Sequence, residues 1–240
     1  MLHAGILAHS AEGAALCFRA FCQEGFRELG AHEHPDVTLD CIAMGRSMAA
    51  WEAGDDDAVR GILAESVRRL AGAGADFFAL PDNTAHLALE TAGPALALPG
   101  LHIADVVAGV AAAAGHRRVG VLGTRFTMDG PIYPRTLATR GIEAVVPDSA
   151  QRATVDRIIF DELVNGVFTA ASRATYVEVI ASLRDRGCDA VALVCTEIPL
   201  LVTPDASSLP TLDSTRLLAR AAFEVAAGRA PLPTWRGGPP

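Results

Sequence analysis

The 240-residue sequence predicts an α/β fold of two similar lobes, each with a parallel β-sheet flanked by helices. Short apolar runs alternate with longer segments in which apolar residues recur three and four positions apart, a rhythm typical of parallel sheets. The chain also repeats itself. Segments 74–84 and 187–197 both run from Gly through Asp into an apolar stretch, and they place Asp82 and Cys195 113 positions apart (195 minus 82). The repeat indicates two halves built alike.

The elements follow from the same patterns. The apolar runs predict strands at residues 4–8, 37–43, 77–81, 101–104, 118–122, 142–146 and 189–194. The helical period predicts helices at residues 12–29, 56–73, 84–92, 104–115, 128–140, 151–165, 172–186 and 213–227. Turn-rich segments 93–100 and 203–210 are the expected crossings between lobes. The first lobe would then be 1–98 plus 209–240, and the second 99–208.

Composition excludes several classes of function. The net charge is -8 with no basic cluster, so we expect no nucleic-acid partner. No apolar run approaches the roughly 20 residues of a membrane span, and there is no charged leader, so we expect a cytoplasmic protein without membrane contact. All the basic residues are arginine, which excludes a pyridoxal aldimine built on lysine. The scattered cysteines and histidines fit neither disulfides nor a metal site, so we expect no cofactor and no metal.

Polar residues follow the strands at the edge where open parallel sheets bind ligands. Asn83, Thr84 and Thr196 lie where helices are expected to begin, so their backbone N–H groups would favour an anion such as a carboxylate. Ser10 and Thr124, at corresponding places in the two halves, could add hydroxyl donors. These five residues are the predicted binding residues for a small carboxylate molecule.

The sequence resembles the aspartate/glutamate racemase superfamily, which includes pyridoxal-independent racemases and related isomerases and decarboxylases. The segments that carry the resemblance are Pro81-Asp82-Asn83-Thr84-Ala85-His86, Val119-Gly120-Val121-Leu122-Gly123-Thr124-Arg125-Phe126-Thr127-Met128 and Val194-Cys195-Thr196-Glu197-Ile198-Pro199-Leu200-Leu201. The resemblance implies two pseudosymmetric lobes, a homodimer, and an active site in the cleft between the lobes. It also implies a catalytic cysteine in each lobe that moves the proton α to a carboxylate. Arg46 would bind a distal carboxylate of the substrate, or be a solvated surface residue.

The sequence departs from the family pattern at three places. Asp82 replaces the usual first cysteine, Ala8-His9-Ser10 replaces a glycine pair, and Val194 replaces a glycine before Cys195. A carboxylate, with a reference pKa of about 3.9, is a weaker base than a thiolate near about 8.5. The deficit is on the order of 6 kcal/mol for taking a proton from carbon. Either burial raises the pKa of Asp82, or the substrate carbon is unusually acidic.

The leading hypothesis is a racemase or epimerase acting at the carbon α to a carboxylate of an amino acid or related acid. Asp82 and Cys195 would form an asymmetric acid–base pair. A second hypothesis is a decarboxylase or cis–trans isomerase that uses Cys195 alone, with Asp82 capping a helix. A third is a carboxylate-binding protein without catalysis.

Overall fold

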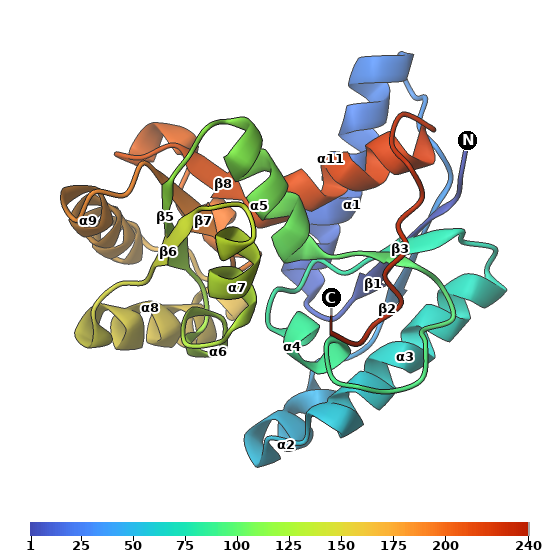
Figure 1. Cartoon of the computed structure of the whole chain (residues 1–240), viewed down its shortest axis with the longest axis horizontal. Helices are drawn as coiled ribbons and strands as arrows, with labels where there is room; N and C mark the ends of the chain where they lie inside the picture. Colours follow the sequence, from blue (N-terminus) through green and yellow to red (C-terminus); the bar gives the residue numbers. More distant parts are fainter. Residues whose placement is uncertain (240) are drawn as a thin grey trace. The chain divides into compact units, whose positions relative to one another are not determined.

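The computed structural model describes residues 1–239 and consists of two compact units. Met1–Ile103 and the chain from Thr215 onward form the first unit, and Ala104–Ser214 forms the second. Each unit has its own sheet, helices and buried core (Figure 1). The predicted α/β fold with a helix-flanked parallel sheet in each half is confirmed, whereas the lobe boundaries at residues 98 and 208 stay a prediction.

The first unit is built on a four-stranded parallel sheet with the strand order β2-β1-β3-β4. Its strands are β1 (Ala4–Ala8), β2 (Val37–Cys41), β3 (Phe77–Ala79) and β4 (Gly100–Leu101). Its helices are α1 (Ala11–Leu29), α2 (Gly45–Ala53), α3 (Asp56–Gly72), α4 (Ala85–Leu89) and most of α11 (Ser214–Ala226). The α3 helix packs against β1 and β2, and β1 and β3 are fully buried because helices and neighbouring strands cover them.

The second unit has a parallel sheet in the order β6-β5-β7-β8. Its strands are β5 (Arg118–Leu122), β6 (Glu143–Val145), β7 (Ala190–Leu193) and β8 (Thr211–Asp213). Its α-helices are most of α5 (Ile103–Ala113), then α6 (Arg125–Met128), α7 (Ile132–Ala138), α8 (Ser149–Asp161), α9 (Ala170–Asp185) and α10 (Ile198–Leu201), with 3₁₀ turns at Leu163–Asn165 and Pro204–Ala206. Counted from the first strand of each unit, both sheets have the order 2-1-3-4, so the sequence repeat corresponds to a repeated topology.

In each unit a helix also packs closely against the first strand of the sheet. A Cβ atom at Gly5 in β1 would lie 3.1 Å from Leu70 of α3. A Cβ atom at Gly120 in β5 would lie 2.8 Å from Leu183 of α9. The two leucines are separated in the sequence by the same offset as Asp82 and Cys195. In both strands a larger residue would therefore force the leucine side chain to shift, a packing contact common to the two halves.

The structure differs from the predicted elements in several places. The four-residue helix α10 was not predicted, and the strand expected at 101–104 is only Gly100–Leu101, because α5 begins at Ile103. The α2 helix and the short strand β8 were not predicted, because α2 carries a single buried residue and β8 has three residues. The helix expected at 128–140 is instead two helices, α6 and α7. Gly130-Pro131 separates them, since proline removes a backbone donor and starts α7 rather than continuing α6.

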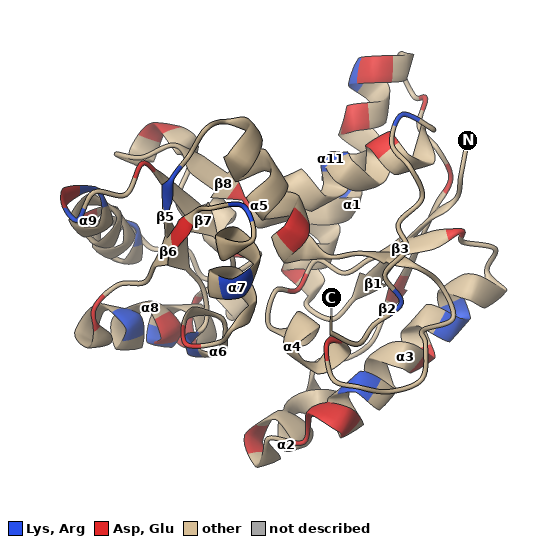
Figure 2. Cartoon of the chain, viewed as in Figure 1, with Lys and Arg blue, Asp and Glu red and all other residues tan. Residues whose placement is uncertain are grey.

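Charged residues are distributed over the helices rather than gathered by sign. Figure 2 shows acidic and basic segments interspersed along α3 and α8. Within residues 1–239, no helix is both long and apolar enough to cross a membrane. Over the same residues, no group of three or more His, Cys, Asp or Glu side chains is arranged to hold a metal ion.

Candidate active site

The strand register brings His9 and Asp82 together in the first unit. In the β1–β3 pair, Ala4 lies opposite Phe77 and Ile6 opposite Ala79. If this register is continued past the strand ends, His9 lies level with Asp82. The side chains meet there, with 2.7 Å between His9 Nδ1 and Asp82 Oδ2. The carboxyl edge of this sheet therefore carries a histidine–carboxylate pair.

The second His9 nitrogen is hydrogen-bonded to Ser47. The Ser47 hydroxyl donates to the backbone oxygen of Met44 at 2.9 Å. Its oxygen also lies 2.6 Å from His9 Nε2. When the serine proton is donated to Met44, His9 Nε2–H is the donor in this second contact. His9 and Ser47 are both buried, so the arrangement is held within the core of the first unit.

The electrostatics of the pair favour a charged histidine and a charged carboxylate. Burial lowers the pKa of His9, but the hydrogen bond and negative charge of Asp82 outweigh it, so the pKa is raised above 6.5. Burial raises the pKa of Asp82, but the hydrogen bond and charge of His9 outweigh it, and the pKa is lowered below 3.8. The expectation that burial would leave Asp82 with a raised pKa is therefore wrong, because a partner of opposite charge lies beside it.

Asp82 also holds the start of α4. Its Oδ1 accepts a hydrogen bond from the backbone N–H of Ala85 at 3.0 Å. His86 Nδ1 lies 2.8 Å from the backbone oxygen of Asp82 and donates to it, while His86 Nε2 accepts from the N–H of Ile103 at 3.3 Å. Burial, with the charge of His102 as a smaller cause, lowers the pKa of His86 to about 3. His86 is thus a neutral structural residue, and Asp82 combines a capping contact with the His9 pair.

In the second unit, Cys195 lies beside a carboxylate of its own. It follows β7, the counterpart of β3, and it is buried. The Cys195 thiol donates to Glu197 Oε2 at 3.1 Å, and the Thr196 hydroxyl donates to the same oxygen at 3.0 Å. Glu197 is itself buried. A buried carboxylate in contact with a thiol can accept the thiol proton and return it, which is the requirement for acid–base chemistry at sulfur.

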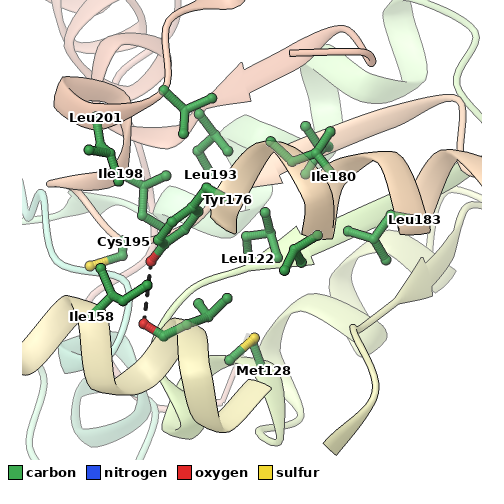
Figure 3. Packing of buried hydrophobic residues seen from close by; sticks show 14 of the residues in the cluster. Leu122, Met128, Ile158, Tyr176, Ile180, Leu183, Leu193, Cys195, Ile198 and Leu201 are labelled. Carbon is green, nitrogen blue, oxygen red and sulfur yellow. Dashed lines mark hydrogen bonds between the residues drawn. The ribbon is translucent and has the colours of Figure 1, made fainter. Parts of the chain in front are cut away.

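The core of the second unit borders this thiol. Figure 3 shows Cys195 next to Tyr176 and Ile198 at the margin of the buried cluster. The Tyr176 hydroxyl donates to the backbone oxygen of Val155 at 3.3 Å, and burial raises the pKa of the phenol well above 10. Tyr176 is therefore a neutral packing residue that supports the strand end carrying Cys195.

The predicted binding residues occupy the strand ends, several of them as helix caps. Ser10 accepts from the N–H of Gly13 and caps α1, and Thr124 accepts from the N–H of Thr127 and caps α6. Continuing the β5–β7 register places Thr124 level with Cys195, as His9 is level with Asp82.

The other predicted residues divide into two groups. Asn83 and Thr196 are buried beside Asp82 and Cys195 respectively, and Thr84 precedes α4. Arg46 lies on α2, is about half exposed, and forms an ion pair with Glu65 of α3 at 2.8 Å. Arg46 is thus held by a carboxylate of this chain, as expected for the surface alternative, and its binding role stays a prediction.

Three residues of the site were not among the predicted site residues, namely His9, Ser47 and Glu197. A signal for His9 was present in the sequence, because His9 and Asp82 are two of the three departures from the family pattern. Their separation equals the register offset between β1 and β3. Ser47 lies on the unpredicted helix α2 and gave no such signal. Glu197 was visible only as the residue two positions after Cys195.

The fold is that of an α/β protein with a repeated half, and a titratable side chain follows the third strand of each sheet, Asp82 in the first unit and Cys195 in the second. The sequence model of the Asp/Glu/Hydantoin racemase family matches residues 18–222. The chain is 30% identical over 167 residues to the broad specificity amino-acid racemase RacX of Bacillus subtilis, covering 69% of this chain and 71% of RacX. The chain belongs to the Asp/Glu/hydantoin racemase family.

Solved structures agree with this assignment. An aspartate racemase homologue from Pyrococcus horikoshii OT3 is 26% identical, with a TM-score of 0.77 over 95% of this chain and all of that one. The aspartate racemase of Picrophilus torridus shares the fold at 23% identity, with a TM-score of 0.78 over 95% of each chain. The predictions of the family and of an isomerase of the racemase type are confirmed at that level.

Proposed function

We propose that the protein is a cofactor-independent racemase or epimerase that acts at the carbon α to a carboxylate of an amino acid or related acid. Asp82 and Cys195 are the two acid–base residues, one on each face of that carbon. The observation that carries the proposal is that one of these residues closely follows the third strand of each sheet, and each is hydrogen-bonded to a partner that can exchange protons. His9 is the partner of Asp82, and Glu197 is the partner of Cys195.

The substrate carboxylate is bound by donors at the strand ends. Asn83 and Thr84 follow Asp82, Thr196 follows Cys195, and the hydroxyl-bearing residues Ser10 and Thr124 follow β1 and β5. The helices α4 and α10 have five and four residues, so any attraction they exert on an anion comes from the backbone N–H groups of about one turn. Direct hydrogen bonds therefore carry most of the binding. No metal or cofactor takes part in the proposed reaction.

The ionised state of Asp82 limits the substrates it can deprotonate. A carboxylate with a lowered pKa is a poor base toward the α-carbon of an ordinary amino acid. Of the two alternatives raised by the sequence, the one that fits is a substrate whose carbon is more acidic. A carbon flanked by a second carbonyl or by an aryl group meets this requirement, as does the ring carbon of a 5-substituted hydantoin.

The test is proton exchange in heavy water. The purified protein is incubated with the twenty L-amino acids, the corresponding D-amino acids, 2-phenylpropionate and 5-benzylhydantoin, and loss of the α-proton is followed by NMR. We expect exchange with at least one probe, fastest for a carbon with a second activating group. Cys195→Ser is expected to reduce exchange at least 100-fold from the enantiomer whose α-proton faces Cys195, whereas Cys41→Ser, at an exposed thiol at the end of β2, leaves exchange unchanged. Exchange from both enantiomers of a probe that is unaffected by Cys195→Ser would contradict the proposal.

A second candidate is a decarboxylase or cis–trans isomerase that uses Cys195 alone. The observation in its favour is that both oxygens of Asp82 already accept hydrogen bonds, from His9 and from Ala85, as in a capping residue. The discriminating probes are phenylmalonate and maleate. Release of carbon dioxide from phenylmalonate, or conversion of maleate to fumarate, with activity retained in Asp82→Asn, would favour this reading over racemisation. Ligand binding without any reaction would instead favour a carboxylate-binding protein.

The remaining predictions concern the setting of the reaction. A cytoplasmic location, a homodimer, and the absence of nucleic-acid and membrane partners are proposed from composition and from the family resemblance. The homodimer is tested by light scattering at micromolar concentration, where a mass of twice 25.0 kDa is expected. A mass of one chain would contradict it.

A further inference from the structure

We propose that His9 is a positioning residue for Asp82. Its imidazole is doubly protonated. One of its N–H groups is hydrogen-bonded to the Asp82 carboxylate, which it keeps ionised and fixed in orientation, and the other is hydrogen-bonded to Ser47, which holds the ring in place. The catalytic consequence of this inference rests on the proposed role of Asp82. The inference about charge and orientation rests on the geometry of the first unit alone.

The hydrogen bonds around His9 allow three proton arrangements. The Ser47 hydroxyl has one proton and lies within hydrogen-bond distance of both His9 Nε2 and the backbone oxygen of Met44. When it donates to His9 Nε2, His9 is neutral with its hydrogen on Nδ1, and when it donates to Met44, His9 Nε2 carries a hydrogen. The 2.7 Å contact between His9 Nδ1 and Asp82 Oδ2 then needs one more proton. That proton belongs either to His9, giving an ion pair, or to Asp82, giving a neutral pair.

The surroundings of Asp82 select the ion pair. The other carboxylate oxygen, Oδ1, accepts from the backbone N–H of Ala85, and acceptor contacts to both oxygens stabilise the ionised form. The directions of the pKa shifts agree, upward for His9 and downward for Asp82. The further titratable group that acts on Asp82 is His86, whose burial keeps it neutral.

The sequence supplies a second, independent observation. His9 and Asp82 are two of the three departures from the family pattern, and they lie on different strands, 73 positions apart. The β1–β3 register nevertheless places them side by side. A carboxylate where a thiol is usual, and an imidazole where a small residue is usual, form one hydrogen-bonded unit. The unusual acid–base residue therefore comes with the cation that keeps it ionised.

The first experiment needs no substrate. In protein labelled with ¹⁵N-histidine, the His9 resonances are identified as those missing from His9→Asn, or by through-bond assignment if that variant does not fold. We expect both His9 nitrogens to be protonated at pH 6.5, with a titration midpoint above 6.5. In Asp82→Asn the midpoint is expected below 6.5, because burial then acts without the carboxylate. A neutral His9 at pH 6.5, or a midpoint unchanged by Asp82→Asn, would overturn the inference.

The second experiment separates a positioning role from a purely structural one. The probe that exchanges fastest in heavy water is used to measure kcat/KM against pH for the wild type and for His9→Asn. Asparagine can donate a hydrogen bond to Asp82 but has no charge. We expect the acid limb of the His9→Asn profile to move upward by about one to three pH units.

The matched control is His116→Asn. His116 Nδ1 lies 3.4 Å from Asp189 Oδ1, which makes a second histidine–aspartate pair. Asp189 precedes β7, at the strand end opposite to Cys195. The profile of this variant should match the wild type. An unshifted acid limb in folded His9→Asn would show a structural role only and would overturn the positioning role. If no probe exchanges, the proposed function fails, and the NMR titration still decides whether His9 sets the charge of Asp82.

Discussion

At the residue scale, the central feature is that neither proposed acid–base residue is alone. Asp82 is paired with His9 in the first unit, and the Cys195 thiol is hydrogen-bonded to Glu197 in the second. The two pairs differ in chemistry. One joins a carboxylate to a cation, and the other joins a thiol to a carboxylate. In the proposed mechanism the two acid–base groups therefore differ in basicity, and this difference limits which substrates can be deprotonated.

Replacing Asp82 by cysteine tests this reading of basicity. A thiolate is a stronger base than a carboxylate by roughly four to five pKa units, and the adjacent His9 favours its charged form. We expect Asp82→Cys to increase α-proton exchange of ordinary amino acids such as alanine at least tenfold over the wild type. Heavy-water NMR measures the rate. An unchanged or lower rate in a folded variant would count against Asp82 as the base.

The ion pair also predicts how stability depends on pH. His9 has a raised pKa, so its contribution is complete below its unfolded value of about 6.5 and is lost as pH rises through the folded value. Asp82 has a lowered pKa, so its contribution is complete above its unfolded value of about 3.9 and is lost as pH falls through the folded value. The pair therefore stabilises the fold most between about pH 4 and 6.5.

Urea unfolding of the wild type and Asp82→Asn checks this window. Asparagine keeps an oxygen that can accept from Ala85 but has no charge. The free energy of unfolding should differ more between the two proteins at pH 5.5 than at pH 9. Above about pH 6.5 the histidine of the unfolded chain loses its proton, so the raised pKa of His9 in the folded wild type contributes less stability. An equal difference at both values would mean that no ion pair forms.

At this scale the sequence predicts candidate positions of the site, but not the partners that set their chemistry. Asp82 and Cys195 follow from the repeat, because a repeated strand end is visible in the residue order. The pairing of His9 with Asp82 depends on strand register, which is set by contacts distant in sequence. The lowered pKa of Asp82 could not be predicted without that partner.

At the scale of elements, the packing of helix on strand explains the repeated glycines. Gly120 has no room for a methyl group, because a Cβ atom would lie 2.8 Å from Leu183. We expect Gly120→Ala to destabilise the protein by about 1–3 kcal/mol through overpacking. Gly109 lies within α5 and has no atom within 4 Å of a Cβ position. Gly109→Ala should therefore stabilise by up to about 1 kcal/mol. Thermal or urea unfolding measures both, and equal effects would contradict the packing argument.

The elements with strong periodicity were predicted from the sequence. The strand Ala4–Ala8 and the helix Ala11–Leu29 agree with expectation to within one residue. The elements that were not predicted from the sequence are short or exposed. The α2 helix buries only Ser47, so its apolar pattern is weak, and the three-residue strand β8 is too short to have a detectable period. Ser47, which anchors His9, was missed together with its helix.

At the scale of the whole molecule, duplication accounts for the arrangement of the chemistry. Both sheets have the same strand order, and in both the first and third strands carry the residues of the site on their carboxyl ends. The chain belongs to the Asp/Glu/hydantoin racemase family, and two of the three departures noted in the sequence, His9 and Asp82, lie in the first half. The second half has Cys195 where the first has Asp82, so the two halves share one topology and differ in this side chain.

The most direct test of the two-residue mechanism follows each enantiomer separately. Starting from one pure enantiomer of the fastest probe in heavy water, initial α-proton loss is measured for Asp82→Asn and Cys195→Ser, and the experiment is repeated from the other enantiomer. The account predicts opposite preferences, with Asp82→Asn slowing exchange mainly from one enantiomer and Cys195→Ser mainly from the other. Exchange from both enantiomers that is unaffected by Asp82→Asn would contradict it.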